Sequence, residues 1–461
     1  MNRLLLSAAH KSSGKTLVSI GLCAAYRRRG LSVSTFKKGP DYIDPLWLAR
    51  ASARPCWNLD FFTMGENEIR SCFQAHQHAA DIVLVEGNKG LHDGLDVKGT
   101  DSNAALATLL DLPVILILDV TGITRGVAPL LTGYTQFDPD VRIGGVILNR
   151  VAGPRQEHKL RAAIEYYTDL PVLGAIGRTP KFVIDERHLG LVPGNEDGEA
   201  ALRIEEIADV VENDVALDAL LDLTDAPSAK SQGPAQVSPP KRVTRGRPIR
   251  IGIARDRAFG FYYPDDLSAF ERAGAELVPF DTLNDARLPQ VDGLFIGGGF
   301  PECFIEALSA NTSLCDAIRG FVEAGGPAYA ECGGLMYLTR SISWQGVCKP
   351  MVGVIPADTQ VGQRPVGRGY MQFRVLADHP WPMAAGTPDK VYNAHEFHYS
   401  HLEGLPESTS TVLSVERGYG LDGVRDGIHI YNLLATYVHQ RHVQTNPWVD
   451  AFTAFVRTHR T

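Results

Sequence analysis

Short apolar runs recur along the first 220 or so residues, and they constrain the fold more than any other feature of the sequence. Each run is rich in Val and Ile, ends in a polar residue or glycine, and is separated from the next by a stretch long enough for a helix. Strands that are apolar on both faces are typical of a parallel sheet covered by helices. The sequence therefore predicts an α/β domain, with strands at 81–87, 113–120, 143–150 and 171–177.

This pattern stops at residues 224–248 and then begins again. The interruption holds five prolines among small polar residues and a basic tail, and it has neither a helical nor a strand period. Such a composition is typical of an interdomain linker. Apolar runs resume after it, at 249–255, 275–281, 293–299 and 327–334. The predicted organisation is a first domain over 1–223, a linker over 224–248 and a second domain over 249–461.

Charge and hydropathy exclude two classes of partner. The formal net charge is −8, which gives no support to a nucleic-acid role. No apolar run approaches the roughly 20 residues that a membrane-spanning helix needs. The opening run is also too short for a secretory signal. We therefore expect a cytoplasmic protein that binds neither nucleic acid nor a membrane.

A loop that reads SAAHKSSGKT, residues 7–16, follows the first apolar run and precedes a predicted helix. The usual phosphate loop reads G-x-x-x-x-G-K-[ST], and here Ala9 replaces its first glycine. The functional end of the loop, Gly14, Lys15 and Thr16, is present. Its backbone N–H groups can hold phosphates of ATP, with Lys15 on the β- and γ-phosphates and Thr16 on Mg²⁺. An alanine costs little where φ is negative, so we predict an ATP site.

Acidic and basic residues gather near this loop in sequence. Glu86 ends the predicted strand at 81–87, and the Gly-rich stretch that follows carries Asp93. The segment FKKGPDYIDP, residues 36–45, packs two lysines and two aspartates around Gly and Pro. It reads either as a solvated turn or as a turn ordered by charged ligands, and its place beside a phosphate loop favours the second interpretation.

This set of residues favours one kind of phosphoryl transfer. The sequence offers acids to hold Mg²⁺ and lysines to neutralise anions, but no evident base to activate a protein hydroxyl. A carboxylate acceptor is already a nucleophile, so positioning and charge neutralisation suffice. The product would be an acyl phosphate, which needs a second nucleophile to complete the reaction.

The second domain offers a source for that nucleophile. The segment PAYAECGGLMYL, residues 327–338, places Cys332 at a turn between an apolar strand and a predicted helix. Such a turn projects the side chain, and we expect the helix N-terminus to lower the pKa of the thiol. His439 follows a distant apolar run, and a Cys–His pair assembled from distant segments is the usual form of an activated thiol. Backbone N–H groups that could hold an oxyanion are those of Gly298, Gly299 and Gly333.

With these residues, the second domain resembles a class I glutamine amidotransferase domain. The resemblance implies hydrolysis of L-glutamine to glutamate and ammonia through a thioester on Cys332, with His439 as its base. Many members of that superfamily carry a glutamate two residues after the histidine. Here that position is Arg441, so the group that orients His439 stays unassigned.

The whole chain resembles the cobyrinic acid a,c-diamide synthase family, whose first domain is similar to dethiobiotin synthetase. The motifs that carry this resemblance cover nearly the full length. They are KSSGKT (11–16), FKKGPDYIDP (36–45), NLD (58–60), EGNKGLHDG (86–94), ILNR (147–150), ERHLGLVP (186–193), GGGFPE (297–302), ECGG (331–334), HEFHYS (395–400) and TYVHQRH (436–442).

The resemblance implies an α/β fold of two doubly wound parallel-sheet domains, a P-loop NTPase-like domain followed by the amidotransferase domain. It implies that ATP and Mg²⁺ activate the a- and c-acetate carboxylates of cobyrinic or hydrogenobyrinic acid, and that ammonia reaches them by an internal path. A homodimer is one candidate assembly. By motif match, Thr16, Asp41 and Glu86 would hold Mg²⁺, Asn149 would contact the base, and Lys37, Asp44 and Asp93 would serve substrate positioning or coupling.

The macrocycle itself is left open by the sequence. Relatives of this family amidate corrins, nickel-sirohydrochlorin, or sirohydrochlorin and sirohaem, all of them polycarboxylate tetrapyrroles. Arg364, Arg368 and the run HPWP depart from the pattern expected of cobyrinate enzymes, which makes sirohaem amidation the runner-up. The segment HEFHYS could contact the macrocycle or only stabilise a strand.

Two other classes share part of this layout. A cobyric acid synthase would carry a different turn after the second strand. A partition-type regulatory ATPase would have a lysine at the position of His10 and no amidotransferase domain. Neither class fits the chain as well as the diamide synthase family.

Overall fold

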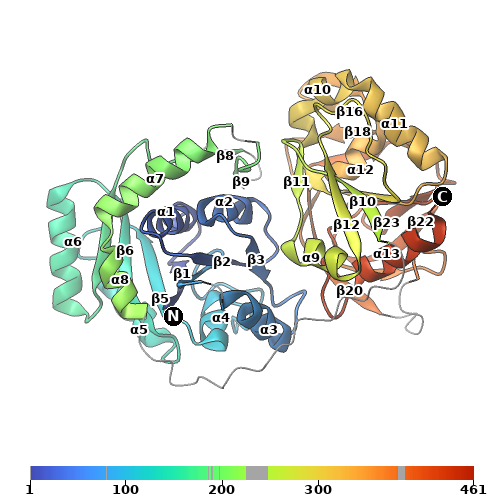
Figure 1. Cartoon of the computed structure of the whole chain (residues 1–461). Coiled ribbons are helices and arrows are strands. Elements are labelled where there is room, and N and C mark those ends of the chain that lie inside the picture. Colours follow the sequence, from blue (N-terminus) through green and yellow to red (C-terminus); the bar gives the residue numbers. More distant parts are fainter. Residues whose placement is uncertain are drawn as a thin grey trace. The chain divides into compact units, whose positions relative to one another are not determined.

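The structure is a computed structural model that describes residues 2–78, 80–184, 186–187, 190–196, 198–224, 248–382 and 390–460. The chain divides into two compact units, Met1–Ser238 and Pro239–Thr461, which run from blue to green and from yellow to red in Figure 1. The predicted linker, 224–248, lies outside the described residues except at its two ends, so the domain boundaries stay a prediction.

The first unit is built on a parallel sheet of seven strands, in the order β3-β2-β4-β1-β5-β6-β7. All four apolar runs predicted as strands are strands of this sheet, and their buried residues reflect cover on both faces. The strands are β1 (Asn2–Ala8), β2 (Val33–Lys38), β3 (Cys56–Leu59), β4 (Ile82–Glu86), β5 (Val114–Asp119), β6 (Ile143–Val151) and β7 (Val172–Gly177).

Helices cover both faces of this sheet. Figure 1 shows α1, α2 and α7 on one face and α3, α4 and α5 on the other. The helices are α1 (Lys15–Arg28), α2 (Ile43–Ser52), α3 (Glu66–Gln77), α4 (Asn103–Leu110), α5 (Val127–Phe137), α6 (Pro154–Tyr167), α7 (Ala200–Asp214) and α8 (Leu217–Thr224). Two short strands, β8 (Glu186–Arg187) and β9 (Gly190–Leu191), pair with each other.

Strand β4 lies between β2 and β1, and this order positions the first site. Glu86, the last residue of β4, is paired with Lys37 on β2 and with Leu6 on β1. Lys37 and Lys38 are thus the last residues of a strand, whereas the sequence pattern predicted a turn for them. Carboxyl ends of parallel strands meet at one edge of a sheet, so this edge brings Lys37 and Glu86 to the phosphate loop.

The second unit holds a sheet of nine strands in the order β12-β10-β13-β15-β24-β23-β22-β19-β20. The strands from β12 to β24 are parallel, as predicted, while those from β24 to β20 are antiparallel and were not predicted. The parallel strands are β10 (Ile249–Ala254), β12 (Ala275–Phe280), β13 (Gly293–Ile296), β15 (Ala328–Glu331) and β24 (Leu433–Thr436). The others are β19 (Gly367–Val375), β20 (Val391–His398), β22 (Thr411–Arg417) and β23 (Arg425–Ile430).

Two apolar cores flank this sheet. One contains residues of α10, α11 and α12, and the other contains residues of α9 and α13. These helices are α9 (Pro264–Arg272), α10 (Ile305–Ala310), α11 (Thr312–Glu323), α12 (Gly333–Leu338) and α13 (Trp448–His459), with a 3₁₀ helix η1 at Pro301–Phe304. Smaller sheets pair β11 (Phe259–Phe261) with β14 (Gly298–Gly299), and join β16 (Thr339–Trp344), β17 (Val347–Pro350), β18 (Ile355–Val361) and β21 (Ser400–Glu403). Across the described ranges, no helix is long and apolar enough to cross a membrane.

Candidate active sites

The phosphate loop ends at Gly14, which has a φ of +90° immediately before α1. A Cβ at this position would lie 2.2 Å from Nδ2 of Asn149, so both the backbone and the available space require glycine. Asn149 Nδ2 also donates a hydrogen bond of 2.9 Å to the carbonyl of Ser13. Ala9 does not have a positive φ, in keeping with the expectation that alanine is tolerated there.

Lys15 reaches from α1 toward the Gly-rich loop after β4. Its Nζ donates a hydrogen bond of 2.7 Å to the carbonyl oxygen of Lys89. Burial, together with the like charge of Lys37, lowers the pKa of Lys15 to about 8. In the same loop, Asp93 Oδ2 accepts a hydrogen bond of 2.9 Å from the Gly90 N–H. The phosphate loop and the 87–94 loop therefore face each other, and Asp93 orders the second of them.

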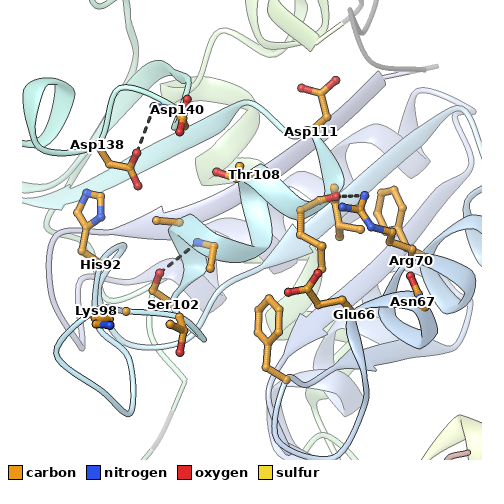
Figure 2. Close-up of a pocket in the computed structure, with 18 of the residues that line it drawn as sticks. Glu66, Asn67, Arg70, His92, Lys98, Ser102, Thr108, Asp111, Asp138 and Asp140 are labelled. Atoms are coloured by element: carbon orange, nitrogen blue, oxygen red, sulfur yellow. Dashed lines mark hydrogen bonds between the residues drawn. The ribbon is translucent and has the colours of Figure 1, made fainter. Parts of the chain in front are cut away.

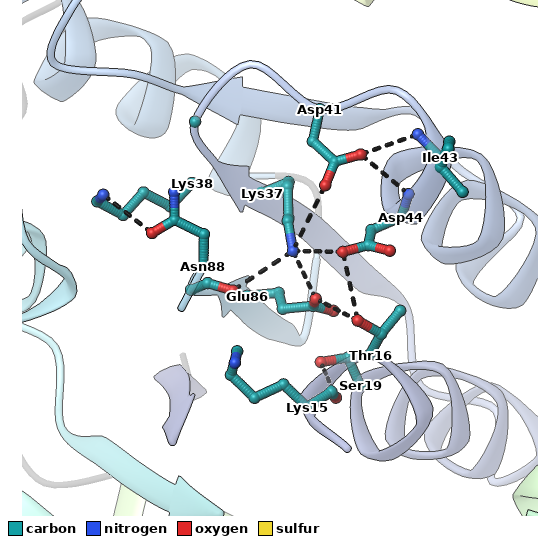
Figure 3. A network of polar contacts seen from close by, with 12 residues as sticks. Lys15, Thr16, Ser19, Lys37, Lys38, Asp41, Ile43, Asp44, Glu86 and Asn88 are labelled. Carbon is teal, nitrogen blue, oxygen red and sulfur yellow. Dashed lines mark hydrogen bonds and ion pairs between the residues drawn. The ribbon is translucent and has the colours of Figure 1, made fainter. Parts of the chain in front are cut away.

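Lys37 lies within a cluster of three carboxylates, Asp41, Asp44 and Glu86, which we call the carboxylate cluster (Figure 3). Its Nζ is 2.6 Å from Asp44 Oδ2, 2.7 Å from Glu86 Oε1 and 3.8 Å from Asp41 Oδ2. Thr16 Oγ1 donates to Glu86 at 2.9 Å and to Asp44 at 3.3 Å. The structure thus joins the start of α1 to Asp44 and Glu86 directly.

The two aspartates of the cluster differ in environment. Asp41 Oδ1 accepts hydrogen bonds from the N–H groups of Ile43 and Asp44, the first residues of α2. Burial and the neighbouring Asp44 raise the pKa of Asp41 to about 7. For Asp44 burial acts in the same direction, but Lys37 outweighs it and lowers the pKa of Asp44. Asp44 is therefore the aspartate that carries a full negative charge beside Thr16 and Glu86.

These residues fit a Mg²⁺ ion. Within the part of the chain that the structure describes, Glu86 Oε2 is buried and has no hydrogen-bond partner, which is costly for a carboxylate oxygen unless a cation meets it. No group of three His, Cys, Asp or Glu side chains suited to a metal occurs in the described ranges. A hydroxyl with two carboxylates suits Mg²⁺, which keeps several of its waters and also binds phosphates.

A cavity of about 1160 Å³ lies apart from this cluster, beside α3 and α4 (Figure 2). Its charged lining comprises four carboxylates and three cations, so its charge does not match that of a polycarboxylate ligand. The carboxylates are Glu66, Asp111, Asp138 and Asp140, and the cations are Arg3, Arg70 and Lys98. We therefore do not assign an anionic substrate to this cavity.

In the second unit, Cys332 stands between β15 and α12 with φ 48° and ψ −101°. This backbone conformation is strained for a residue with a side chain and is typical of a nucleophile at a strand-to-helix turn. A Cβ on Gly333 would lie 3.0 Å from the nitrogen of Gly299, and one on Gly334 would lie 2.1 Å from the Ile296 carbonyl oxygen. Glycines therefore allow the turn to press against the 297–299 loop.

The expectation that the helix N-terminus lowers the pKa of this thiol is wrong. Burial, and after it the charge of Glu302, raises the pKa of Cys332, while the Gly333 N–H only partly opposes them. The helix is six residues long, and the thiol lies in a closed environment that disfavours the thiolate. Activation of Cys332 therefore requires a base or a bound substrate.

His439 is buried and fixed on several sides. Its backbone N–H donates to the carbonyl of His395 at 2.8 Å, and the two imidazole rings stack with centroids 4.9 Å apart. A Cβ on Gly298 would lie 2.6 Å from its Cε1. Its Nδ1 lies 3.7 Å from Oε2 of Glu331. We call Cys332, His439 and these neighbours the thiol site.

Sequence reasoning missed two neighbours of His439, namely Glu331 and His395. Glu331 directly precedes Cys332, and that adjacency was the available signal. The segment HEFHYS belongs to this site. Besides His395, it supplies Phe397, whose carbonyl oxygen lies 3.7 Å from Cys332 Sγ. The side chains of His395, Glu396 and His398 are buried, so they are not exposed for contact with a macrocycle.

Two of the features that favoured sirohaem amidation belong to the core and to the thiol site. Trp381 of the HPWP run is buried and packs against Tyr329 and Trp448 in the core beside α13. Arg368 is exposed and stands opposite Phe397 in the β19–β20 pair, with its guanidinium over the Phe397 ring. Its nearest chemistry is therefore the thiol site.

Comparison with known proteins extends both halves of this description. Residues 7–191 match the family model of a CobQ/CobB/MinD/ParA nucleotide binding domain, and residues 250–447 match that of a CobB/CobQ-like glutamine amidotransferase domain. The chain is 46% identical to a cobyrinate a,c-diamide synthase of Magnetococcus marinus over 99% of this chain and 97% of that protein. Proteins of the same name from Methanosarcina acetivorans and Syntrophotalea carbinolica are 40% and 38% identical, over 95% and 99% of this chain and 92% and 98% of theirs.

Proposed function

The chain belongs to the cobyrinate a,c-diamide synthase family, and from this premise we propose that it amidates the a- and c-acetate carboxylates of cobyrinic or hydrogenobyrinic acid, using ATP and glutamine. It is a glutamine-dependent ligase that forms C–N bonds. One observation carries the proposal: a phosphate loop with a carboxylate cluster and a buried Cys–His site occur in the same chain. Each of the two sites supplies what the other lacks, because an activated carboxylate needs ammonia and released ammonia needs an acceptor.

The first unit would bind ATP through the N–H groups of the phosphate loop and Lys15. Thr16, Asp44 and Glu86 would hold Mg²⁺, which would neutralise charge on the β- and γ-phosphates. This assignment exchanges the roles that motif matching implied for Asp41 and Asp44, because Asp44 contacts Thr16 while Asp41 holds the start of α2. Asn149, which holds the phosphate loop through Ser13, is also placed to meet the nucleotide base.

The phosphoryl step needs little more than alignment. An oxygen of the acetate carboxylate attacks the γ-phosphorus, the bond from that phosphorus to the β–γ bridging oxygen breaks, and ADP leaves. Lys37 would offset the negative charge of the approaching carboxylate, since its Nζ already lies between acidic groups. Asp93 would keep the 87–94 loop in place beside Lys15. Ammonia then attacks the acyl carbon, and inorganic phosphate leaves as the amide forms.

The second unit would supply that ammonia. His439 takes the proton of the Cys332 thiol as sulfur attacks the side-chain carbonyl of glutamine, and N–H groups of Gly298, Gly299 or Gly333 would hold the oxyanion. His439 then gives the proton to the departing ammonia and leaves a thioester. Water hydrolyses the thioester to glutamate with His439 as base. Burial keeps the thiol protonated in the resting site, so this proton transfer is essential.

Sirohydrochlorin, sirohaem and nickel-sirohydrochlorin are the alternative acceptors. They would use the same two sites, since all are polycarboxylate tetrapyrroles. Cobyrinate is favoured because relatives of that name align over nearly the whole chain, and because Trp381 belongs to the core. A homodimer remains one candidate assembly.

Two variants test the division of labour. Cys332→Ala should abolish amidation with glutamine and leave amidation with ammonium salts intact. Lys15→Met should abolish amidation with either nitrogen source and leave glutamine hydrolysis measurable. Glutamine-dependent amidation that survives in Cys332→Ala would contradict the proposal.

A further inference from the structure

The position that usually orients the histidine in a class I glutaminase is taken by Arg441, and this arginine is engaged elsewhere. Its side chain is buried, and Nη2 lies 2.7 Å from Asp265 Oδ2 at the start of α9. The guanidinium also lies over the ring of Tyr263, 5.1 Å from its centroid. A cation held in this way has no acceptor atom to offer an imidazole N–H. The group that orients His439 must therefore come from another segment.

Glu331 offers such a group. Strands β15 and β24 are parallel neighbours, and their register pairs Glu331 with Thr436, three residues before His439. Oε2 of Glu331 lies 3.7 Å from Nδ1 of His439, and both side chains are almost fully buried, with 2% and 3% of their surface exposed. At this distance and depth a carboxylate acts strongly on an imidazole, since little solvent screens the pair.

The other oxygen of Glu331 is already bound, which fixes the direction of the carboxylate. Oε1 accepts a hydrogen bond of 2.7 Å from the Tyr329 hydroxyl and one of 2.9 Å from the Gln440 N–H. Gln440 Nε2 in turn donates to the Tyr329 hydroxyl at 3.0 Å. Oε2 is thus the oxygen that faces His439.

The imidazole is held just as firmly from its two faces. The ring of His395 stacks on it at an interplanar angle of 19°, and Gly298 leaves room for Cε1 only because it lacks a Cβ. These contacts fix the plane of the ring and keep its Nδ1 directed toward Glu331.

We propose that Glu331 is the positioning residue of the glutaminase site, and that it replaces the downstream glutamate of other class I enzymes. It holds the tautomer of His439 that carries hydrogen on Nδ1, so that Nε2 can accept the proton of Cys332. This assignment rests on the proposed function, because the roles of Cys332 and His439 belong to it. Glu331 acts through His439 and does not itself exchange a proton with glutamine.

The test compares Glu331→Gln and Glu331→Asp in the full chain, with the exposed Glu306→Gln as the matched control. We expect Glu331→Gln to lower kcat for glutamine hydrolysis on the order of 10²-fold or more, because an unoriented base is ineffective. KM should change by less than about threefold, since the substrate contacts remain. Glu331→Asp should recover part of kcat, and amidation with ammonium salts should be unchanged in all three variants.

A second readout does not depend on activity. Nitrogen NMR of protein with labelled histidine reports the tautomer of His439, whose signals are those lost in His439→Gln. We expect the Nδ1–H form in the native chain and a mixture of tautomers in Glu331→Gln. If the native chain lacks glutaminase activity, the proposed function fails while this readout still decides the role of Glu331. Unchanged kcat or an unchanged tautomer in Glu331→Gln would overturn the proposal, and Glu331→Asp serves the same purpose if Glu331→Gln does not fold.

Discussion

The Nζ of Lys37 lies 2.7 Å from Oε1 of Glu86, and the two residues are direct neighbours across strands β2 and β4. Only 3% of the Lys37 side chain and none of the Glu86 side chain is exposed. A buried charge pair of this kind contributes less by its attraction than it would cost if one partner were removed. The pair is therefore a sensitive place to test the first site.

Replacing Lys37 with methionine should destabilise the first unit. The substitution leaves Glu86 and Asp44 close together without their cation, and breaking such a buried pair costs about 3–5 kcal/mol. Denaturant unfolding of the full chain measures the loss, and added Mg²⁺ should restore part of it. The control is Lys349→Met, whose exposed pair with Glu306 has a distance of 2.8 Å and should contribute less than about 1 kcal/mol. Equal losses in both variants would contradict this prediction.

The two aspartates of the carboxylate cluster should respond differently to removal of their charge. Asp44→Asn takes away a proposed Mg²⁺ ligand, so the Mg²⁺ concentration for half-maximal amidation should rise about tenfold or more. Asp41→Asn should leave this concentration nearly unchanged and destabilise the start of α2 by about 1 kcal/mol. Mg²⁺ titrations of initial rates, combined with melting curves, separate the two effects. A stronger Mg²⁺ effect in Asp41→Asn would instead identify Asp41 as the ligand.

Gly14→Ala should abolish ATP binding. The new Cβ would lie 2.2 Å from Asn149 Nδ2, and it would force both the phosphate loop and Asn149 to move. Gly30→Ala is the matched control, because Gly30 has a similar φ of +80° and a Cβ there would meet nothing within 4 Å. It should cost only about 1–2 kcal/mol for the left-handed backbone and leave the affinity for ATP unchanged. Calorimetric titration with ATP distinguishes them, and comparable affinity in both variants would argue against the steric explanation.

Alkylation of Cys332 should depend on pH in the direction set by its surroundings. Because burial and Glu302 raise the pKa of this thiol, the protonated form dominates at neutral pH and the rate with iodoacetamide should rise steadily as pH increases. Glu302→Gln removes the negative charge, lowers the pKa and should speed the reaction at a given pH. Mass spectrometry of the Cys332 peptide measures both rates. A rate that is already at its plateau at neutral pH, or that falls in Glu302→Gln, would be inconsistent with this environment.

The sequence predicted those parts of the fold that depend on burial alone. The runs at 81–87 and 113–120 are apolar because helices cover both faces of the first sheet, and they are strands β4 and β5. Strand β2 was partly missed, because it ends in Lys37 and Lys38, whose charges are met by residues distant in sequence. The antiparallel strands from β19 to β23 were also not predicted, since their residues alternate and include many polar side chains.

The candidate sites show the same limit. The motif GKT and the turn at Cys332 are local patterns, so Lys15, Thr16 and Cys332 could be proposed from the sequence. The relation between Glu331 and His439 depends on the register of β15 with β24, which a single sequence does not reveal. The choice between Asp41 and Asp44 likewise depends on how α2 begins, because the aspartate that holds the backbone of α2 is the one turned from Thr16.

The most direct measurement is mass spectrometry of the product formed with ATP, Mg²⁺ and glutamine, with cobyrinic acid and sirohydrochlorin offered in parallel. A cobyrinate a,c-diamide synthase should convert two carboxylates of cobyrinic acid to amides, and Cys332→Ala should form this product only with ammonium salts. Amidation of sirohydrochlorin alone would contradict the choice of macrocycle and leave the chemistry of both sites in place. Glutamine hydrolysis without amidation of either compound would contradict the central claim.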